Sequence, residues 1–421
     1  MRFWNEKAVW LTFMLSICCS TARTLEKLLR AKNVIFPSLI NPSSYCCIRK
    51  LSYVNVYMKW KKDPSYDSIE TIFRSPELKS LISLKNCISQ APSGCIPISD
   101  VSKRGKELGV PVKVAKFMRL YPSVFEEFVG PQYNLPWFRL TPEAIKIDVE
   151  EKAIYEDCRS DLQLRLKKLI LMTREKRLPL RIIQGVQWYL GLPDGFLKNP
   201  EKNLDGSFRF VEMEDGDRAL AVDCGEKMLS TLQKNLVGRG MCNGGWMEPI
   251  PFPLFPSRGL RLKTKISAWL DEFQKLPYVS PYEDFSHLNP DSDIAEKRVV
   301  GALHELLSLF VEHAAERKRL LCLKKYLGFP QKFHKAFERH PHMFYLSLKA
   351  HTCTAILKEA YNDAAAIERH PLFTLRKKYI ELMTDSDRIL KQRRLNKNLI
   401  YGQNADSISD INSEYRDEMA L

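Results

Sequence analysis

The feature that most constrains the fold of this chain is a short motif, Leu-Gly-x-Pro, that occurs three times. The copies are Leu108–Pro111, Leu190–Pro193 and Leu327–Pro330, with the third starting 219 residues after the first. Residues downstream of the first copy recur at the same offsets after the third: Lys113, Lys116, Pro122 and Phe125 match Lys332, Lys335, Pro341 and Phe344. Self-similarity at a fixed spacing indicates one supersecondary unit used several times.

The first copy predicts two helices joined by a tight turn. Residues 99–108 have the apolar spacing of a helix, and Gly109 is expected to end it in the left-handed conformation. Pro111 is expected to open the next helix, where its missing N–H has no partner in any case. That second helix would bury Val114 and Phe117.

Each motif also has a predicted helix ahead of it and β-prone residues behind it. The helices are Glu77–Cys87, Leu162–Arg174 and Glu296–Ala314. The strands are Trp137–Thr141, the hairpin Ser207–Met213 with Arg218–Val222, and Met343–Leu348. This order is the plan of a winged helix-turn-helix. We therefore predict a mainly α fold with small β-hairpins (α+β), built from three winged-helix-like repeat units in series.

The composition divides the chain into a presequence, a folded region and a tail. The expected parts are a targeting presequence at 1–50, a folded region at 51–385 and a basic, then polar, disordered tail at 386–421. Within the folded region we expect unit one at 67–148, unit two at 150–225, a proline-rich bridge at 246–292 and unit three at 293–361.

Charge is concentrated at the start of the chain. The net charge is +15, and the first 62 residues hold 11 Lys or Arg but only two acids. This pattern is typical of an organellar targeting peptide, although the apolar run Ala8–Cys19 resembles a secretory signal. Eleven cysteines without a Cys-x-x-Cys spacing favour a reducing compartment. No run of 18 apolar residues predicts a transmembrane helix, so we expect no membrane partner.

Sequence motifs for catalysis are absent. No Walker loop and no Gly-x-Gly-x-x-Gly after a strand is present. His340 and His342 form the only close histidine pair, and without further ligands nearby they are expected to be partly exposed loop residues. We therefore predict no enzyme, no cofactor, no metal site and no small-molecule substrate.

Basic residues near the repeated turns are the candidate binding residues. Those on helices or turns that a helix-turn-helix presents to a nucleic-acid backbone are expected to contact phosphates. They are Lys103, Arg104, Lys106, Lys113, Lys116, Arg119, Lys167, Lys168, Arg317, Lys318, Lys324, Lys325, Lys332 and Lys335. The alternative is that each group is an ordinary solvated helix face.

Several of these stretches together resemble the plant organelle RNA recognition (PORR) domain, a family that includes the What's This Factor proteins. The matching stretches are Tyr53–Asp63, Leu108–Phe125, Trp137–Thr141, Leu178–Leu180 and Leu190–Pro193. The resemblance covers roughly residues 51–385 and implies organellar RNA binding. It further implies a part in splicing group II introns, with intron RNA and possible further splicing factors as partners and with no catalytic residues.

Two other functions fit the same units. One is an organellar DNA-binding or transcription-associated factor, and the other is a protein scaffold whose bridge, Pro249–Pro256, recruits partners. For localisation, Ser and Thr are sparse before residue 60. This favours the mitochondrion, with the chloroplast as the alternative.

Overall fold

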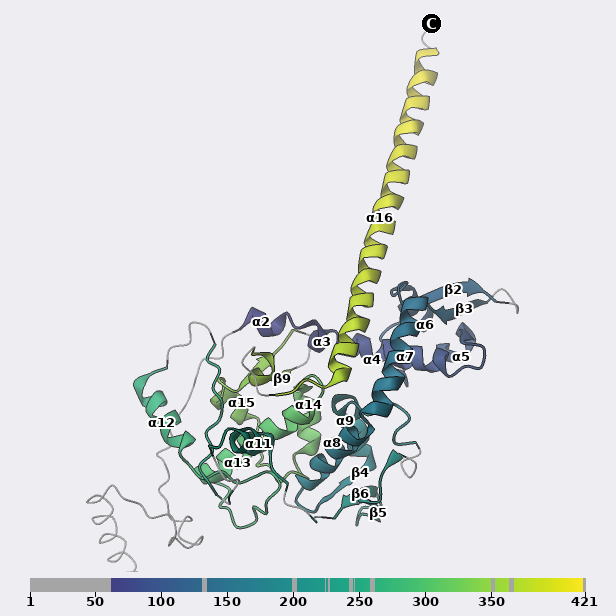
Figure 1. Cartoon of the computed structure of the whole chain (residues 1–421). Helices are drawn as coiled ribbons and strands as arrows, with labels where there is room; N and C mark the ends of the chain where they lie inside the picture. The colour runs from purple at the N-terminus through teal and green to yellow at the C-terminus, as the bar shows by residue number, and fades with distance from the viewer. Residues whose placement is uncertain are drawn as a thin grey trace, which may run out of the picture. The chain divides into compact units, whose positions relative to one another are not determined.

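The structure is a computed structural model of the whole chain (Figure 1). It describes residues 62–130, 135–198, 203–223, 225, 228–241, 245, 247–257, 262–349, 353–362 and 367–418, with side chains to residue 396. The predicted presequence, 1–50, lies outside the described residues. No helix in the described part is long and apolar enough to cross a bilayer.

Unit one contains a three-stranded antiparallel sheet in the order β1-β3-β2. Its elements are α4 (Ser75–Ser89), β1 (Cys95–Pro97), α5 (Ile98–Ser102), α6 (Val114–Arg119), β2 (Phe125–Val129), β3 (Pro136–Leu140) and α7 (Pro142–Asp157). The predicted helix at 99–108 is wrong in length, because α5 ends at Ser102 and turns follow. Helix α6 begins three residues after Pro111, not at it.

Unit two contains a second antiparallel sheet, in the order β4-β6-β5. Its elements are α8 (Arg159–Leu171), β4 (Arg177–Pro179), α9 (Leu180–Leu190), β5 (Phe208–Glu212) and β6 (Arg218–Val222). The predicted hairpin is confirmed: Phe208 pairs with Val222 and Glu212 with Arg218. Gly216 has a φ of +75° in the turn between them, where a residue without Cβ is favoured.

Unit three repeats the arrangement with the order β7-β9-β8. Its elements are α13 (Asp293–Leu309), β7 (Ala314–Glu316), α14 (Arg317–Leu323), α15 (Lys335–Arg339), β8 (Phe344–Ser347), β9 (Thr354–Leu357) and the 3-10 helix η2 (Lys358–Tyr361). The predicted helix 296–314 is too long, since its last residue, Ala314, starts β7.

The predicted α+β class is confirmed, since helices surround three small antiparallel sheets. In each sheet the last strand lies in the middle, between a short first strand and the second. The short first strands were not predicted, because three residues are too few to show an alternating pattern. That these are three copies of one winged-helix unit stays a prediction.

The glycine of every repeated motif has a positive φ. The angle is +69° at Gly109, +80° at Gly191 and +63° at Gly328. Gly191 is the C-cap of α9, in the left-handed conformation. The prediction that Gly109 ends a helix is wrong, because α5 ends at Ser102, whereas the corresponding Gly191 does end a helix.

The segment ahead of unit one packs on unit three. Helices α2 (Pro64–Asp67) and α3 (Glu70–Phe73) lead into α4. Ser347 of β8 donates a hydrogen bond to Asp67 at 2.7 Å, and the rings of Tyr66 and Tyr345 stack with centroids 5.1 Å apart. The N-terminal and C-terminal repeats are thereby tied together across the chain.

Helix α11 (Thr231–Gly238) precedes the bridge, and the bridge contains an extended stretch at 248–257 and helix α12 (Thr264–Gln274). Phe252 in this stretch is buried, its N–H donates to Gln274 Oε1 at 2.7 Å, and Gln274 Nε2 donates back to its carbonyl at 3.0 Å. The N–H of Phe255 donates to the carbonyl of His342 in unit three at 2.8 Å. The proline-rich stretch thus lies between α12 and unit three.

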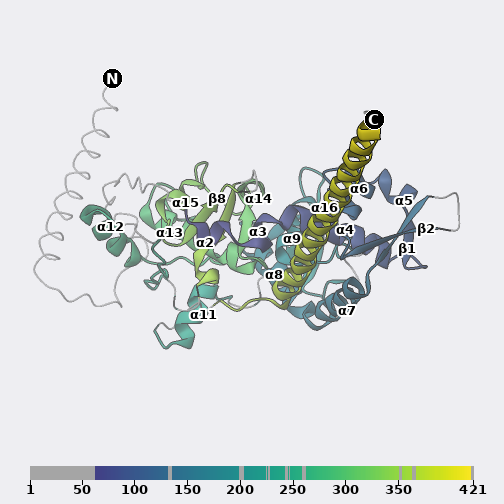
Figure 2. The same cartoon turned by 90° about the horizontal axis from the view of Figure 1, so that it is seen from above.

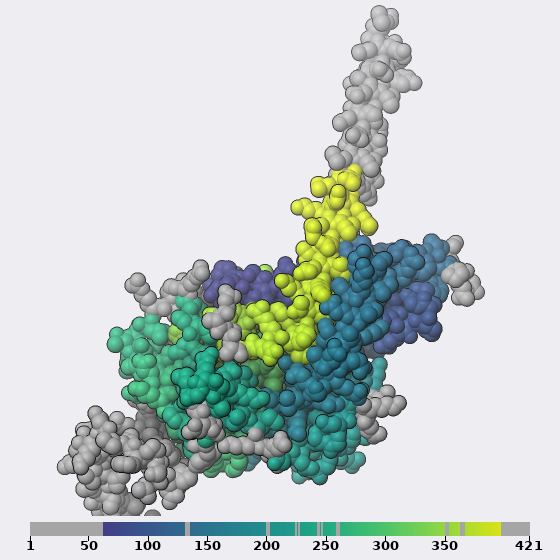
Figure 3. Space-filling view, in the orientation of Figure 1, coloured from purple at the N-terminus to yellow at the C-terminus, as the bar shows by residue number. Residues whose placement is uncertain are grey.

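Helix α16 (Pro371–Glu418) connects the units (Figures 1 and 2). In unit one, Tyr379 donates a hydrogen bond to Glu151 of α7 at 3.0 Å, and Lys85 pairs with the same carboxylate at 2.7 Å. Arg376 pairs with Glu312, ahead of β7, and donates to the carbonyl of Trp188 in α9 at 2.8 Å. In the space-filling view the start of α16 lies against α7 (Figure 3).

The predicted boundary of a disordered tail at residue 386 differs from the structure. Ser386 is buried and accepts a hydrogen bond from the N–H of Ser123 at 3.1 Å, and Arg74 pairs with Asp387 at 2.5 Å. The backbone stays helical to Glu418. The physical reason is local, because residues 386–418 contain a single glycine and no proline to interrupt a helix.

Substitution of Gly191 by alanine is expected to destabilise the protein more than the same change at Gly109. Both positions have a positive φ, which costs alanine about 1 kcal/mol. A Cβ at Gly191 would also lie 2.8 Å from Val311 Cγ2 and 2.9 Å from Leu372 Cδ1, whereas at Gly109 the nearest atom is 3.6 Å away. Overpacking of this kind adds roughly 1–3 kcal/mol.

The measurement is the free energy of unfolding in urea for G191A and G109A. Equal losses of stability in the two variants would show that Gly191 packs less tightly against Val311 and Leu372 than these distances indicate.

Candidate nucleic-acid interface

The predicted cations of unit one are exposed. On α6, Val114, Phe117 and Met118 are buried, so the helical period leaves Lys116 and Arg119 on the solvent side. Arg119 donates to both carboxylate oxygens of Glu127, at 2.7 and 2.6 Å. Lys116 forms no ion pair among the described residues, so its charge is available to a ligand.

The turns that precede α6 carry the other four cations of unit one. Lys103, Arg104, Lys106 and Lys113 are all exposed. Arg104 donates to both carboxylate oxygens of Glu107 at 3.2 Å. This exposed pair is screened by solvent and adds little stability, so Arg104 remains accessible to a competing anion.

Three of the predicted cations of unit three, Arg317, Lys332 and Lys335, lie near His334. Lys318, Lys325, Lys332 and Lys335 are exposed, whereas Arg317 and Lys324 are half-buried. Lys324 donates to the side chain of Gln331. Burial lowers the pKa of His334, and the nearby charges of Arg317, Lys335 and Lys332 lower this pKa further. The carboxylate of Glu338 has the opposite effect and raises the pKa. Arg317, Lys332 and Lys335 are therefore close to the same imidazole.

The unit-two prediction is wrong for one of its two residues. Lys168 is buried and pairs with Glu305 of α13 at 3.4 Å, while its neighbour Lys167 is half-buried. Glu305 also accepts hydrogen bonds from Thr231 N–H at 2.6 Å and from Tyr282 at 2.7 Å. Lys168 thus joins unit two to unit three and the bridge, and it is not available to RNA. The sequence of a basic helix does not indicate which of its lysines faces a buried carboxylate.

Three cations outside the set of candidate binding residues lie where the units meet. Lys79 of α4 and Arg319 of α14 are close: partial burial lowers the pKa of Lys79, and the charge of Arg319 lowers it further. Arg319 Nη1 lies over Gly185 of α9, 3.7 Å from the place of a Cβ. Lys198, after α9, faces Glu107 of unit one, whose pKa is lowered first by Arg104 and then by Lys198. Residues 240 apart in sequence carry no spacing signal, so only the fold could find them.

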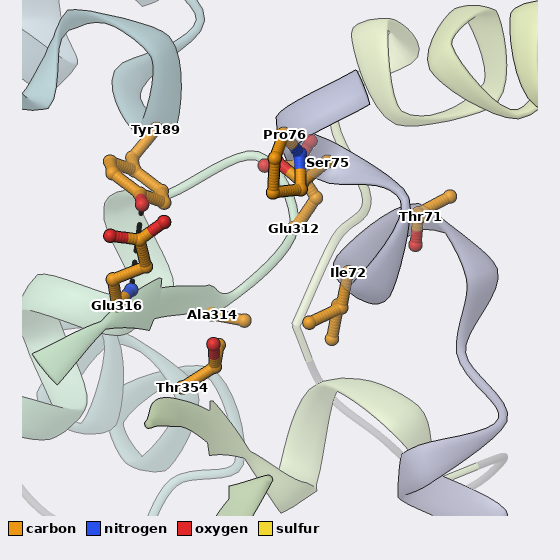
Figure 4. Close-up of a pocket in the computed structure, with 9 residues that line it drawn as sticks. All are labelled: Thr71, Ile72, Ser75, Pro76, Tyr189, Glu312, Ala314, Glu316 and Thr354. Carbon is orange, nitrogen blue, oxygen red and sulfur yellow. Dashed lines mark hydrogen bonds between the residues drawn. The ribbon is translucent and has the colours of Figure 1, made fainter. Parts of the chain in front are cut away.

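A pocket lies at the same junction (Figure 4). It has a volume of only about 20 Å³, room for roughly one water molecule, and its walls come from α3, α4, α9, β7 and β9. The indole N–H of Trp188 donates to Ser75 Oγ at 3.1 Å, which joins α9 to α4 at its edge. Glu312 and Glu316 line it, and the N–H of Glu316 donates to Tyr189 Oη at 3.5 Å. Burial raises the pKa of Glu312, and the paired Arg376 opposes that rise.

The described residues contain no group of three or more His, Cys, Asp or Glu side chains placed to hold a metal ion. The prediction that His340 and His342 are partly exposed is wrong, because they are 2% and 4% exposed. His340 contacts Glu296 at 3.3 Å and packs against the ring of Phe273. The bridge covers this loop, which the sequence around the two histidines does not reveal.

Comparison with known proteins gives one family and several relatives. The plant organelle RNA recognition domain matches residues 61–388. Protein WHAT'S THIS FACTOR 9, mitochondrial, of Arabidopsis thaliana is 62% identical over 82% of this chain and 90% of its own length. Protein WHAT'S THIS FACTOR 1, chloroplastic, of Zea mays is 29% identical over 76% of this chain and 66% of its own length. No solved structure matches the chain.

A further relative is Protein ROOT PRIMORDIUM DEFECTIVE 1 of Arabidopsis thaliana, which is 26% identical over 78% of this chain and 84% of its own length. The predicted preference for the mitochondrion is confirmed by the relative at 62% identity.

Replacement of Lys168 by methionine is expected to destabilise the fold without removing an RNA contact. The substitution leaves a buried carboxylate without its cation, which costs about 3 kcal/mol. The matched control is Lys167→Met on the next residue, for which a change within about 0.5 kcal/mol is expected. Urea denaturation measures the first effect and RNA affinity of the folded variant the second. If K168M lost RNA affinity while its stability stayed unchanged, Lys168 would have to be assigned to the RNA-binding residues.

Proposed function

Because this chain belongs to the plant organelle RNA recognition domain family, we propose that it binds intron RNA in the mitochondrion and promotes the splicing of group II introns. The protein supplies binding energy, and the folded intron supplies the chemistry. It contributes no catalytic group of its own. Further splicing factors join the same RNA.

One observation carries the proposal: unit one and unit three expose lysines at matching positions. Lys113 and Lys116 correspond to Lys332 and Lys335, and Lys106 corresponds to Lys325, each 219 residues later. All six side chains are exposed. A solvated helix face has no need to keep its lysines at fixed offsets from a turn, whereas a repeated phosphate contact does.

The exposed cations differ in how tightly the protein already holds them. Arg104 and Arg119 each donate two hydrogen bonds to an adjacent glutamate, whereas none of the six matching lysines has an ion pair among the described residues. An RNA phosphate therefore has fewer internal contacts to displace at the lysines. We assign the lysines the main phosphate contacts and the two arginines a smaller part.

Two weak sites on one chain favour a long ligand. Units one and three each offer a small basic group, and binding at one raises the effective concentration of RNA at the other. A folded intron is long enough to reach both groups, and a short duplex has no such advantage. The same geometry leaves unit two, with Lys168 buried, as the connecting unit.

The direct test is immunoprecipitation of the tagged protein from isolated mitochondria, followed by sequencing of the recovered RNA. Enrichment of one or a few intron-containing transcripts, together with unspliced accumulation of those transcripts when the protein is depleted, is expected. Recovery of organellar DNA would favour a transcription-associated role. Recovery of proteins with no RNA above background would favour a scaffold.

Charge reversal in unit three tests the phosphate contacts. The variant K332E/K335E is expected to bind RNA more weakly, and the slope of log affinity against log salt is expected to fall by about 1.4, since each lost contact to a single strand contributes roughly 0.7. The control K234E/R239E reverses two exposed charges on and after α11, outside the matching positions. Affinity is measured by fluorescence anisotropy over a salt series, with an intron fragment as probe.

An identical slope in wild type and K332E/K335E would contradict the assignment. A loss of the same size in the control would show that only net charge matters.

A further inference from the structure

The unit-one sheet has two faces, and only one of them belongs to the hydrophobic core. Side chains alternate between the faces along a strand. In β3, Phe138 and Leu140 are buried in the core. Trp137 and Arg139 therefore point to the opposite, outer face. There Trp137 is directly opposite Phe128 of β2, with ring centroids 6.4 Å apart. We call these two rings and Arg139 the outer-face cluster.

The indole of Trp137 lies flat on the backbone of Gly130. A Cβ added at Gly130 would be 2.0 Å from both Cδ1 and Nε1 of the indole, so only glycine leaves room for the ring. Nε1 is buried and has no hydrogen-bond partner among the described residues, and the side chain as a whole is half-buried. Since one face lies on the sheet and the polar edge is covered, the ring offers a ligand its other face.

The matching positions of the other two sheets have no aromatic pair. Ala219 is opposite Val211 in the second sheet, and Thr354 is opposite Ser347 in the third. All three sheets have the same strand arrangement. A pair of rings at this place is therefore not needed to build such a sheet, and the rings of unit one are open to another use.

The third sheet shows that a flat ring can bind to an outer face of this kind. Tyr345 lies on that face and packs with Ala314 and Ile356, apart from the main core. The ring of Tyr66 stacks on it, with centroids 5.1 Å apart and 26° between the planes. In the described part of unit one no ring is stacked in this way on Trp137, since Phe128 is tilted by 43°. A planar ligand has room there.

The charges beside the outer-face cluster suit a nucleic acid. The two acids of β2 are both paired, Glu126 with Arg139 and Glu127 with Arg119 of α6. The second pair holds the end of α6 beside β2, which is an edge strand. Lys116 lies one helical turn before Arg119 and is exposed. A phosphate bound at Lys116 would thus lie near the edge of this sheet.

We propose that the outer-face cluster is a stacking platform for one unpaired RNA base, which lies against the exposed face of the Trp137 indole. This inference rests on the proposed RNA-binding function and adds a base contact to its phosphate contacts. Every base has a π-face, and stacking needs no hydrogen-bond match, so the platform accepts any base. The bases of a duplex are stacked on one another and are not available to it.

A protein partner fits this surface less well. A stable protein interface buries about 800 Å² on each side, and charged residues are depleted at its centre. Here two rings lie beside an exposed ion pair, because the side chains of Arg139 and Glu126 are 54% and 46% exposed. The guanidinium of Arg139 also lies over the Phe128 ring, 5.4 Å from its centroid. A small, charged and aromatic surface of this kind matches a single base.

The experiment measures the affinity of the full chain for a labelled single-stranded RNA of about 12 nucleotides over a salt series. Trp137→Ala is expected to weaken binding about tenfold, because one stacked base is lost. The slope of log affinity against log salt is expected to stay the same, since no phosphate contact is removed. Trp137→Phe, which retains a ring, is expected to recover most of the affinity. Binding of a duplex RNA of the same length is expected to be equal in W137A and wild type.

Gly130→Ala tests the position of the ring. The new Cβ displaces the indole, so binding of the single strand is expected to weaken about tenfold. In the W137A background the same change is expected to have no further effect, because Gly130 acts only through the ring. The matched control is Phe210→Ala in the hairpin of unit two, which removes a half-buried ring with Arg218 over it and is expected to leave the affinity unchanged. Thermal unfolding checks that each variant is folded.

Unchanged affinity of W137A for the single strand, or an equal loss for the duplex, overturns the platform. An equal loss in F210A would also overturn it. If W137A bound RNA normally but no longer recovered a protein that wild type recovers from an organelle extract, the face would bind a protein and not a base. In each of these cases salt-dependent binding by wild type would leave the phosphate contacts intact. No RNA binding by the wild-type chain would refute the proposed function itself.

Discussion

The fold depends on buried charges that are paired between packed elements of the chain. Lys85 of α4 contacts Asp148 at 2.5 Å and Glu151 at 2.7 Å, and Tyr379 of α16 donates to the same Glu151. Lys168 meets Glu305, and Arg376 meets Glu312. A single partner left behind in such a pair would be an uncompensated buried charge, so each pair strongly disfavours arrangements in which the units are separated or shifted.

This constraint divides the cations of the chain into two groups. Those buried between packed elements, such as Lys85, Lys168 and Arg376, stabilise the fold. The remaining cations lie on exposed turns and helices. They include Lys113 and Lys116 in unit one and Lys332 and Lys335 in unit three. Because the units are fixed relative to one another, these outer lysines have a defined separation, and the junction pocket keeps its walls. The positions of the proposed phosphate contacts therefore depend on the same contacts that stabilise the protein.

Sequence reasoning succeeded where a local rule applies. The glycines of the repeated turns have positive φ, and the Asp-Gly turn joins β5 to β6, because these conformations depend on a few neighbouring residues. It failed where a distant segment decides. The bridge buries His340 and His342, and Glu305 of α13 pairs with the buried Lys168. The helicity of α16 beyond Ser386 was missed for a local reason, since residues 386–418 contain one glycine and no proline. The helix expected at 99–108 was too long, since apolar periodicity does not mark where a helix gives way to a turn.

The sequence by itself determined the order of the elements, the α+β class, the family and the basic residues that surround each turn, because spacing, glycine and charge are readable along a chain. Only the tertiary structure decided which of those cations face solvent and which oppose a buried carboxylate. It also brought Lys79 to Arg319, and Ser75 to Glu312 and Glu316. These contacts join residues more than two hundred positions apart, and the packing of three units against one helix creates them, so no local pattern encodes them.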